Sequence, residues 1–233
     1  MTKPRLTHFL ITRFNLRHTE WQQDRNRQAC LTDEWLRDRF HLFETFCYPS
    51  VRAQSRTDFT WLCFFDSETP SEYRNRISKF ELMPNFVPLF IDGMAELLPR
   101  LKQEIEARAG GASHIITSRL DNDDALHRDY IASVQVAFTG QDFLPVNITD
   151  GYQIILRESR RYEVCTAHFE YNPFISLIEA KDGFQTILAK SLPDWKDESK
   201  RGYLIEKRYL WAQVVHDRNY ANRKNTTSFY TTR

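Results

Sequence analysis

The sequence lacks the cysteine pairs that most zinc motifs require. Its four cysteines form no CxxC motif and stand far apart along the chain, at positions 30, 47, 63 and 165. This spacing excludes a zinc site of the CxxC type. Cys47, Cys63 and Cys165 lie in apolar segments, so we interpret the cysteines as reduced core residues of a cytosolic protein.

Long apolar runs are also missing. No segment approaches the ~20 apolar residues of a membrane-spanning helix, and the apolar region at residues 8–14 is short and interrupted by Arg13. We therefore expect no transmembrane segment, no signal peptide and a cytoplasmic location, with peripheral contact at the inner face of the membrane left open. The formal net charge is only +1, which argues against a nucleic-acid partner.

Lysine is scarce relative to arginine. The 32 basic residues comprise 23 Arg and 9 Lys. Guanidinium groups bind phosphate through two hydrogen bonds and keep their charge when half buried. The composition fits a ligand that carries phosphate, although an arginine-rich, solvated surface explains it equally well.

One stretch combines an apolar run with a cluster of acids. Residues 114–124 read HIITSRLDNDD, so Ile115 and Ile116 lead into Asp121, Asp123 and Asp124. Carboxylates at the end of a strand repel one another unless a divalent cation or Arg side chains neutralise them. Capping of a following helix is the alternative, since Asp and Asn are common turn residues. The missing turn-making Gly and the lack of a Glu at the right distance argue against a calcium loop.

The first half of the chain alternates predicted strands with predicted helices. We expect strands at residues 7–14, 59–65 and 86–91, followed by the acidic strand at 114–120. Helices are expected from Thr32 to near Pro49, then at 71–80, 95–109 and 126–138. This order predicts an α/β fold with a mainly parallel sheet.

The second half is less regular. Residues 147–158 and 162–169 suggest an antiparallel hairpin, and the segments at 173–180 and 186–189 remain ambiguous. Residues 204–215 suggest a helix leading into a strand, or a strand alone. We expect one domain over 1–233, with a first half to about 125, a second half to about 220, and a basic tail at 221–233.

Six segments together carry a family resemblance: HFLITRFN (8–15), WLRDRFHLFETFCYPSVRAQS (35–55), FTWLCFFD (59–66), SRLDNDDAL (118–126), NPFISLIE (172–179) and WAQVVHDRN (211–219). In this order they resemble the bacterial family known as putative rhamnosyltransferases, which has the glycosyltransferase-A fold, a Rossmann-like mixed sheet flanked by helices. The resemblance implies metal-dependent transfer of a sugar, with rhamnose as one candidate, from a nucleotide-diphosphate donor. The implied acceptor is a hydroxyl of a saccharide, polysaccharide or lipid-linked molecule. The resemblance makes the half to about 125 the nucleotide-sugar and metal half, and the half to about 220 the acceptor half.

The resemblance also implies the metal ligands. Asp121 and Asp123 match its DxD pair: Asp123 would ligate Mn²⁺ or Mg²⁺, and Asp121 would contact the ribose or reach the metal through water. His216 matches a late histidine that completes the metal and diphosphate site.

Further matched positions would bind the donor. Thr12, Arg13 and Asp66 match strand-end positions that hold the base and ribose, and Arg119 is placed to face the diphosphate. For Asp66 the alternative is an N-cap, and for Arg119 it is charge compensation of the acids.

The general base is the least determined residue. An inverting transferase needs a carboxylate to take the acceptor proton, and Glu179, Glu170 and Asp150 are all candidates. We favour Glu179, although a solvated carboxylate after a buried strand explains it as well, and a retaining enzyme would need no such base. Two other functions stay open: a non-catalytic scaffold that binds nucleotide sugars, and a phosphatase of the haloacid dehalogenase type. In that phosphatase class, the DxD normally ends the first strand.

Overall fold

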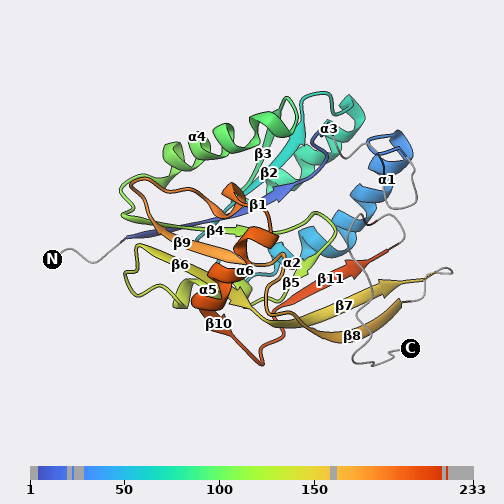
Figure 1. Ribbon diagram of the computed structural model, residues 1–233. Coiled ribbons are helices and arrows are strands. Elements are labelled where there is room, and N and C mark those ends of the chain that lie inside the picture. The colour runs from blue at the N-terminus through green and yellow to red at the C-terminus, as the bar shows by residue number, and fades with distance from the viewer. Residues whose placement is uncertain (1–4, 20–22, 24–28, 158–161, 217–218, 220–233) are drawn as a thin grey trace.

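The centre of the fold is a seven-stranded sheet in the order β10-β6-β9-β4-β1-β2-β3 (Figure 1). The computed structural model describes residues 5–19, 23, 29–157, 162–216 and 219. Only β9 runs antiparallel to its neighbours in the large sheet, so this sheet is mainly parallel. The strands are β1 (Leu6–Arg13), β2 (Thr60–Asp66), β3 (Phe86–Ile91), β4 (His114–Arg119), β6 (Phe143–Ile148), β9 (Ser176–Ala180) and β10 (Tyr203–Ile205).

Alternation along the central strands explains why both faces of this sheet are covered. In β2, Trp61, Cys63 and Phe65 point to one hydrophobic cluster, while Leu62 and Phe64 point to the other, and all five are buried. A parallel strand that is apolar on both faces needs a helical layer on each side. The aromatic run at 59–65 therefore forms a buried strand, as predicted.

Helices form the two outer layers. The cluster on one face includes α4 (Leu97–Ala109) and the 3₁₀ turns Ile187–Ala189 and Pro193–Trp195. Four helices contribute to the cluster on the other face, α1 (Asp33–Leu42), α2 (Tyr48–Arg52), α3 (Ser71–Ile77) and α5 (Tyr130–Val136). A π-helical segment, Phe43–Cys47, joins α1 to α2, and 3₁₀ turns at Ser78–Leu82 and Met94–Glu96 flank β3. The short helix α6 (Lys196–Arg201) lies against β6 and β10.

A second, four-stranded sheet has the order β5-β11-β7-β8. In Figure 1 its three longer strands lie at the lower right, below α1. The strand β11 runs parallel to β7 and antiparallel to β5, and β7 pairs with β8 as the predicted hairpin. The strands are β5 (Ala125–Leu126), β7 (Asp150–Leu156), β8 (Tyr162–His168) and β11 (Trp211–Val215).

Three boundaries differ from the sequence prediction. The single strand expected at 147–158 is two strands, because the chain leaves the large sheet after Ile148 and enters the small sheet at Asp150. The helix expected at 126–138 begins only at Tyr130, and its first residue belongs to β5 instead. The segment 204–215 contributes to two strands, β10 and β11, with no helix among its described residues.

The remaining expectations resolve simply. The ambiguous segments are a strand, β9, and the 3₁₀ turn Ile187–Ala189. The four cysteines form no disulfide among the described residues; Cys47, Cys63 and Cys165 are buried, whereas Cys30 is partly exposed. Among the described helices, none has the length and apolar character needed to cross a membrane. The expected tail at 221–233 lies outside the described residues.

A close approach of backbone and side chain explains the change of sheet after Ile148. The Trp211 indole donates to the carbonyl of Ile148 at 2.7 Å. The same ring lies against Gly151, where a Cβ atom would be 2.1 Å from Trp211 Cδ2. Only a glycine lets the first residues of β7 pass this buried ring.

We predict that Gly151→Ala destabilises the protein by about 1–3 kcal/mol, the usual cost of overpacking a core. The measurement is urea unfolding of the variant beside Gly111→Ala, whose added Cβ would meet only the end of the Arg5 side chain. Equal stability of the two variants would contradict the packing described for Trp211.

A chain of buried polar groups crosses the large sheet. His8 Nε2 lies 2.8 Å from Ser118 Oγ, which lies 2.5 Å from Ser176 Oγ, and the hydroxyl of Tyr130 completes the chain at 3.1 Å. These contacts link β1, β4, β9 and α5. Burial lowers the pKa of His8 to about 3, although the charge of Asp58 acts in the opposite direction. His8 is therefore neutral in the folded protein.

We predict that acid destabilises the protein partly through His8. The unfolded chain takes up a proton near pH 6.5, but the folded protein does so only near pH 3, so this contribution is complete above 6.5 and is lost as the pH falls toward 3. The expected loss at pH 5 is about 2 kcal/mol. Urea unfolding at pH 7 and pH 5 tests this: His8→Asn should flatten the difference, and His41→Asn, on the exposed side of α1, should not. An unchanged pH dependence in His8→Asn would exclude this role.

Candidate functional site

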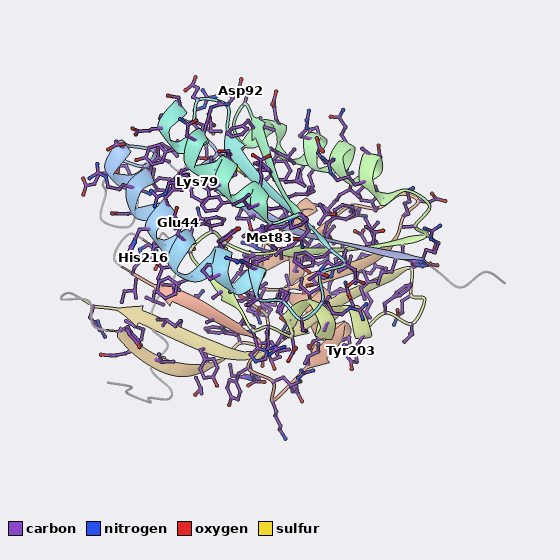
Figure 2. The ribbon with its side chains drawn as sticks, turned by 180° about the vertical axis from the view of Figure 1, so that it is seen from behind. Glu44, Lys79, Met83, Asp92, Tyr203 and His216 are labelled. Carbon is purple, nitrogen blue, oxygen red and sulfur yellow. The ribbon has the colours of Figure 1, made fainter. Side chains whose placement is uncertain are left out.

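The acidic stretch lies where the two sheets and helix α1 meet. It follows β4, whose carboxyl end shares one edge of the large sheet with the carboxyl ends of β1 and β2. The chain turns sharply there, since the amide of Asp124 donates to the carbonyl of Asp121 at 3.2 Å. Ligands of open α/β sheets bind at this edge. Figure 2 shows His216 at the end of β11, beside the helical segment that contains α1.

Asp123 is the centre of the site. Its Oδ2 atom lies 2.9 Å from His216 Nε2, 2.7 Å from Arg39 Nη1 and 3.0 Å from Asn219 Nδ2. Burial would raise the pKa of Asp123, but the charge of Arg39 and the hydrogen bond from His216 outweigh it and lower the pKa to about 2. Asp123 is therefore a buried carboxylate that stays ionised at neutral pH.

Asp121 faces outward from the same turn. Its side chain is 36% exposed, and its Oδ1 atom lies 3.4 Å from Arg119 Nη2 and 3.7 Å from Arg13 Nη2. Burial lowers the pKa of Arg13, and the charge of Asp121 opposes this shift. The structure thus brings together five of the predicted residues: Arg13, Arg119, Asp121, Asp123 and His216.

Two other predicted donor-binding residues are engaged elsewhere. Thr12 is fully buried, and its hydroxyl accepts a hydrogen bond from the Trp61 indole at 3.0 Å, so its side chain belongs to the core. Asp66 lies at the correct edge but is only 3% exposed. Its carboxylate accepts from the backbone amides of Arg17 at 3.0 Å and Glu68 at 2.9 Å, and it pairs with the Arg17 guanidinium. Both side chains stabilise the strand ends rather than presenting free groups.

The structure places Glu179 away from the acidic loop. In the antiparallel pair of β9 with β4, Glu179 lies opposite Ile115, near the start of β4, whereas Ser176 lies opposite Ser118 near its end. Its two carboxylate oxygens accept from the amides of Gln185 and Thr186, each at 2.9 Å. Burial raises its pKa, and these amides act in the opposite direction. This carboxylate holds a loop at the opposite end of β4 from the acidic turn.

The other two candidate bases lie near each other, since Asp150 is opposite His168 in the register of β7 with β8 and Glu170 follows His168 by two residues. The Asp150 side chain is 14% exposed, and its carboxylate contacts His168 at 3.0 Å and accepts from the amide of Lys207 at 2.7 Å. Glu170 lies at the same edge as the acidic loop: its carbonyl accepts from Asn147, next to the carboxyl end of β6. Its side chain is exposed. Of the three carboxylates, Glu170 alone combines exposure with the correct edge.

Three site residues were missed from the sequence: Arg39, Asn122 and Asn219. Arg39 stacks on the Trp35 ring at 5.0 Å and also donates to Asn122 Oδ1 at 3.2 Å. Its spacing from Leu36 and Phe43 gave a signal, since an arginine three or four residues from core positions shares their helix face. The two asparagines gave no comparable signal.

The donor set at Asp123 fits a divalent cation. Two ligands at right angles on an ion with bonds of about 2.1 Å are about 3 Å apart, and Asp123 Oδ2 and His216 Nε2 are 2.9 Å apart. The amide of Asn219 is oriented, because its Oδ1 accepts from the His216 backbone at 2.6 Å, so its Nδ2 faces both Asp123 and the His216 ring. In the described part of the chain no three His, Cys, Asp or Glu side chains are grouped for one ion. Asp123 and His216 would therefore hold it with ligand or water oxygens.

Comparison with known proteins identifies the family. The family described as "Putative rhamnosyl transferase" matches residues 7–181. The chain belongs to this family. A search of the curated proteins finds no match.

Solved structures show the fold. The chain is similar to S. aureus TarS residues 1–349 in complex with UDP-GlcNAc, with a TM-score of 0.53 and 10% identity, over 92% of this chain and 60% of TarS 1–349. It is also similar to the mannosyltransferase PcManGT from Pyrobaculum calidifontis in complex with GDP-Man and Mn²⁺, with a TM-score of 0.48 and 14% identity, over 94% of this chain and 59% of that one. The chain thus spans about 60% of the TarS 1–349 structure. The predicted glycosyltransferase-A-type fold is confirmed.

We predict that Arg39→Gln raises the pKa of Asp123 by about one unit or more, because the variant removes the main opposing charge. Carboxyl NMR titration of the free protein measures this directly. Arg37→Gln is the matched control, since Arg37 lies on the same helix but pairs with the exposed Asp33. An Asp123 that still titrates near pH 2 without Arg39 would show that His216 and Asn219 suffice.

Proposed function

We propose that this protein is a metal-dependent glycosyltransferase that moves a sugar, with rhamnose as the first candidate, from a nucleoside-diphosphate donor to a hydroxyl of a saccharide or lipid-linked acceptor. The observation that carries the proposal is the contact between Asp123 and His216 at 2.9 Å, which joins a DxD turn after β4 to the end of β11. The chain that contains this contact belongs to the family described as "Putative rhamnosyl transferase", which supports a sugar-transfer function.

Each residue of the site has a distinct task in this proposal. Asp123 and His216 would hold Mn²⁺ or Mg²⁺, which would neutralise the charge that develops on the departing nucleoside diphosphate. Arg13 and Arg119 lie within reach of Asp121, so two guanidinium groups flank the place where the diphosphate would lie. Asp121 would contact the ribose, or reach the metal through water.

Acceptor activation falls to Glu170 in an inverting reaction. Its side chain is exposed and lies at the same sheet edge as the acidic loop, so it can receive a proton from an acceptor hydroxyl. Glu179 and Asp150 do not meet this requirement. Glu179 lies at the other end of β4, and the Asp150 carboxylate is largely buried and engaged by His168 and the amide of Lys207. The fold similarity to TarS bound to UDP-GlcNAc supports a nucleotide sugar as donor.

The test is thermal unfolding with UDP, dTDP, GDP, ADP or CDP, each with and without Mn²⁺. We expect one nucleotide to stabilise the protein only when Mn²⁺ is present, by about 2.7 kcal/mol at a hundredfold excess over its Kd. Asp123→Ala should abolish this stabilisation. Asp58→Ala should retain it, since Asp58 is an exposed carboxylate paired with Arg56.

Turnover assays then separate the competing functions. Metal-dependent transfer or hydrolysis of the matching nucleotide sugar supports the transferase. Nucleotide binding without turnover would favour a non-catalytic scaffold, and hydrolysis of phosphomonoesters without any nucleotide sugar would favour a phosphatase. The absence of any nucleotide effect would overturn the proposal.

A further inference from the structure

The last acid of the DNDD stretch has no task in the proposed reaction. Asp124 is fully buried, and it points away from the exposed Asp121 side of the turn toward β11. Its Oδ1 atom accepts from the backbone amide of Val214 at 2.8 Å. Its Oδ2 atom is buried and has no hydrogen-bond partner among the described residues. A buried carboxyl with one engaged oxygen needs an explanation.

The strand register gives this contact a structural meaning. Strand β5 pairs with β11 through only two residues, Leu126 opposite Trp211 and Ala125 opposite Ala212. Asp124 is the next residue back along the chain, where the backbone pairing has stopped. Its side chain accepts the amide of Val214 instead and so continues the attachment of the acidic turn to β11.

The position of this bond relative to the metal-binding pair is the main point. Asp123 directly precedes Asp124, and His216 follows Val214 by two residues. The bond therefore ties together the two backbones that carry the pair. Other contacts involve the side chains of the pair. Arg39 donates to the Asp123 carboxylate from α1, and the Asn219 side chain contacts both the Asp123 carboxylate and the His216 ring.

We propose that Asp124 is a positioning residue that sets the separation of Asp123 and His216 by accepting the Val214 amide. The inference rests on the proposed metal-binding role of that pair. Two ligands serve one ion only within a narrow range of separations, and residues behind the ligands commonly alter metal affinity about 10- to 100-fold. Asp124 acts through its acceptor oxygen, and it touches neither the metal nor the donor.

Paired variants distinguish the hydrogen-bond acceptor oxygen of Asp124 from its charge and its volume. Asp124→Asn keeps an oxygen that can accept the Val214 amide, whereas Asp124→Ala removes it. If the alanine variant does not fold, Asp124→Leu replaces it, because leucine has nearly the shape of asparagine without an acceptor. Thr117→Val is the matched control: Thr117 is a buried side chain whose hydroxyl accepts the amide of Ile187, on the face of the large sheet that α4 covers.

Two measurements are made on each full-length variant. Mn²⁺ affinity is measured by calorimetry without nucleotide, and protection of the Val214 amide is measured by hydrogen exchange. We expect the alanine or leucine variant to lose Val214 protection and to bind Mn²⁺ about tenfold more weakly or worse. The asparagine variant should stay within about threefold of the wild type in affinity, and so should Thr117→Val, as neither loses the bond to β11.

Three outcomes would overturn the inference. Wild-type Mn²⁺ affinity in the alanine or leucine variant would show that the bond does not position the pair. An asparagine variant as weak as the alanine variant would assign the effect to charge rather than to the acceptor. A wild-type protein that binds no Mn²⁺, with or without nucleotide, would remove the metal site of the proposed function and this inference with it, whereas the first two results leave that function intact.

Discussion

The ionised carboxylate of Asp123, buried at the end of β4, sets the main constraint on this structure. A buried charge is costly unless it is paired and hydrogen-bonded. Here Arg39 supplies the opposite charge from α1, and His216 and Asn219 contact the same oxygen from the end of β11. Three segments that are far apart in the sequence must therefore meet at one atom, so the position of α1 and the attachment of the small sheet both depend on this contact.

The need to hold a buried, ionised Asp123 explains why the four residues of the acidic turn have different contacts. Asp121 is exposed and faces two arginines, which leaves it available to a ligand. Asn122 donates to the carbonyl of Phe14 at 2.7 Å and so anchors the turn to the end of β1. Asp124 anchors it to β11. The exposed residue and Asp123 can serve binding because the other two fix the backbone between β1 and β11.

The local sequence pattern predicted the elements whose buried residues repeat at a strand or helix spacing. The aromatic run of β2 specifies a strand that is buried on both faces. The spacing of Leu36, Phe40 and Phe43 specifies a helical segment with one buried face. The break after Ile148 was not predictable, because both sides of it favour strands and only the contact between Gly151 and Trp211 decides where the sheets separate. The position of Glu179 was not predictable for a related reason: the sequence places it after an apolar run, but the direction of β9 decides which end of the sheet it reaches.

The residues of the candidate site come from two parts of the chain, one inside the family match and one after it. The family match covers residues 7–181, which include Arg39 and the whole acidic turn. His216 and Asn219 lie beyond it, on the segment that follows β11. The first part thus provides the negative charge and its arginine partners, and the imidazole reaches them only because β11 inserts between β5 and β7 of the small sheet. Metal binding would therefore report on the docking of this last strand, since neither part of the chain alone holds both ligands.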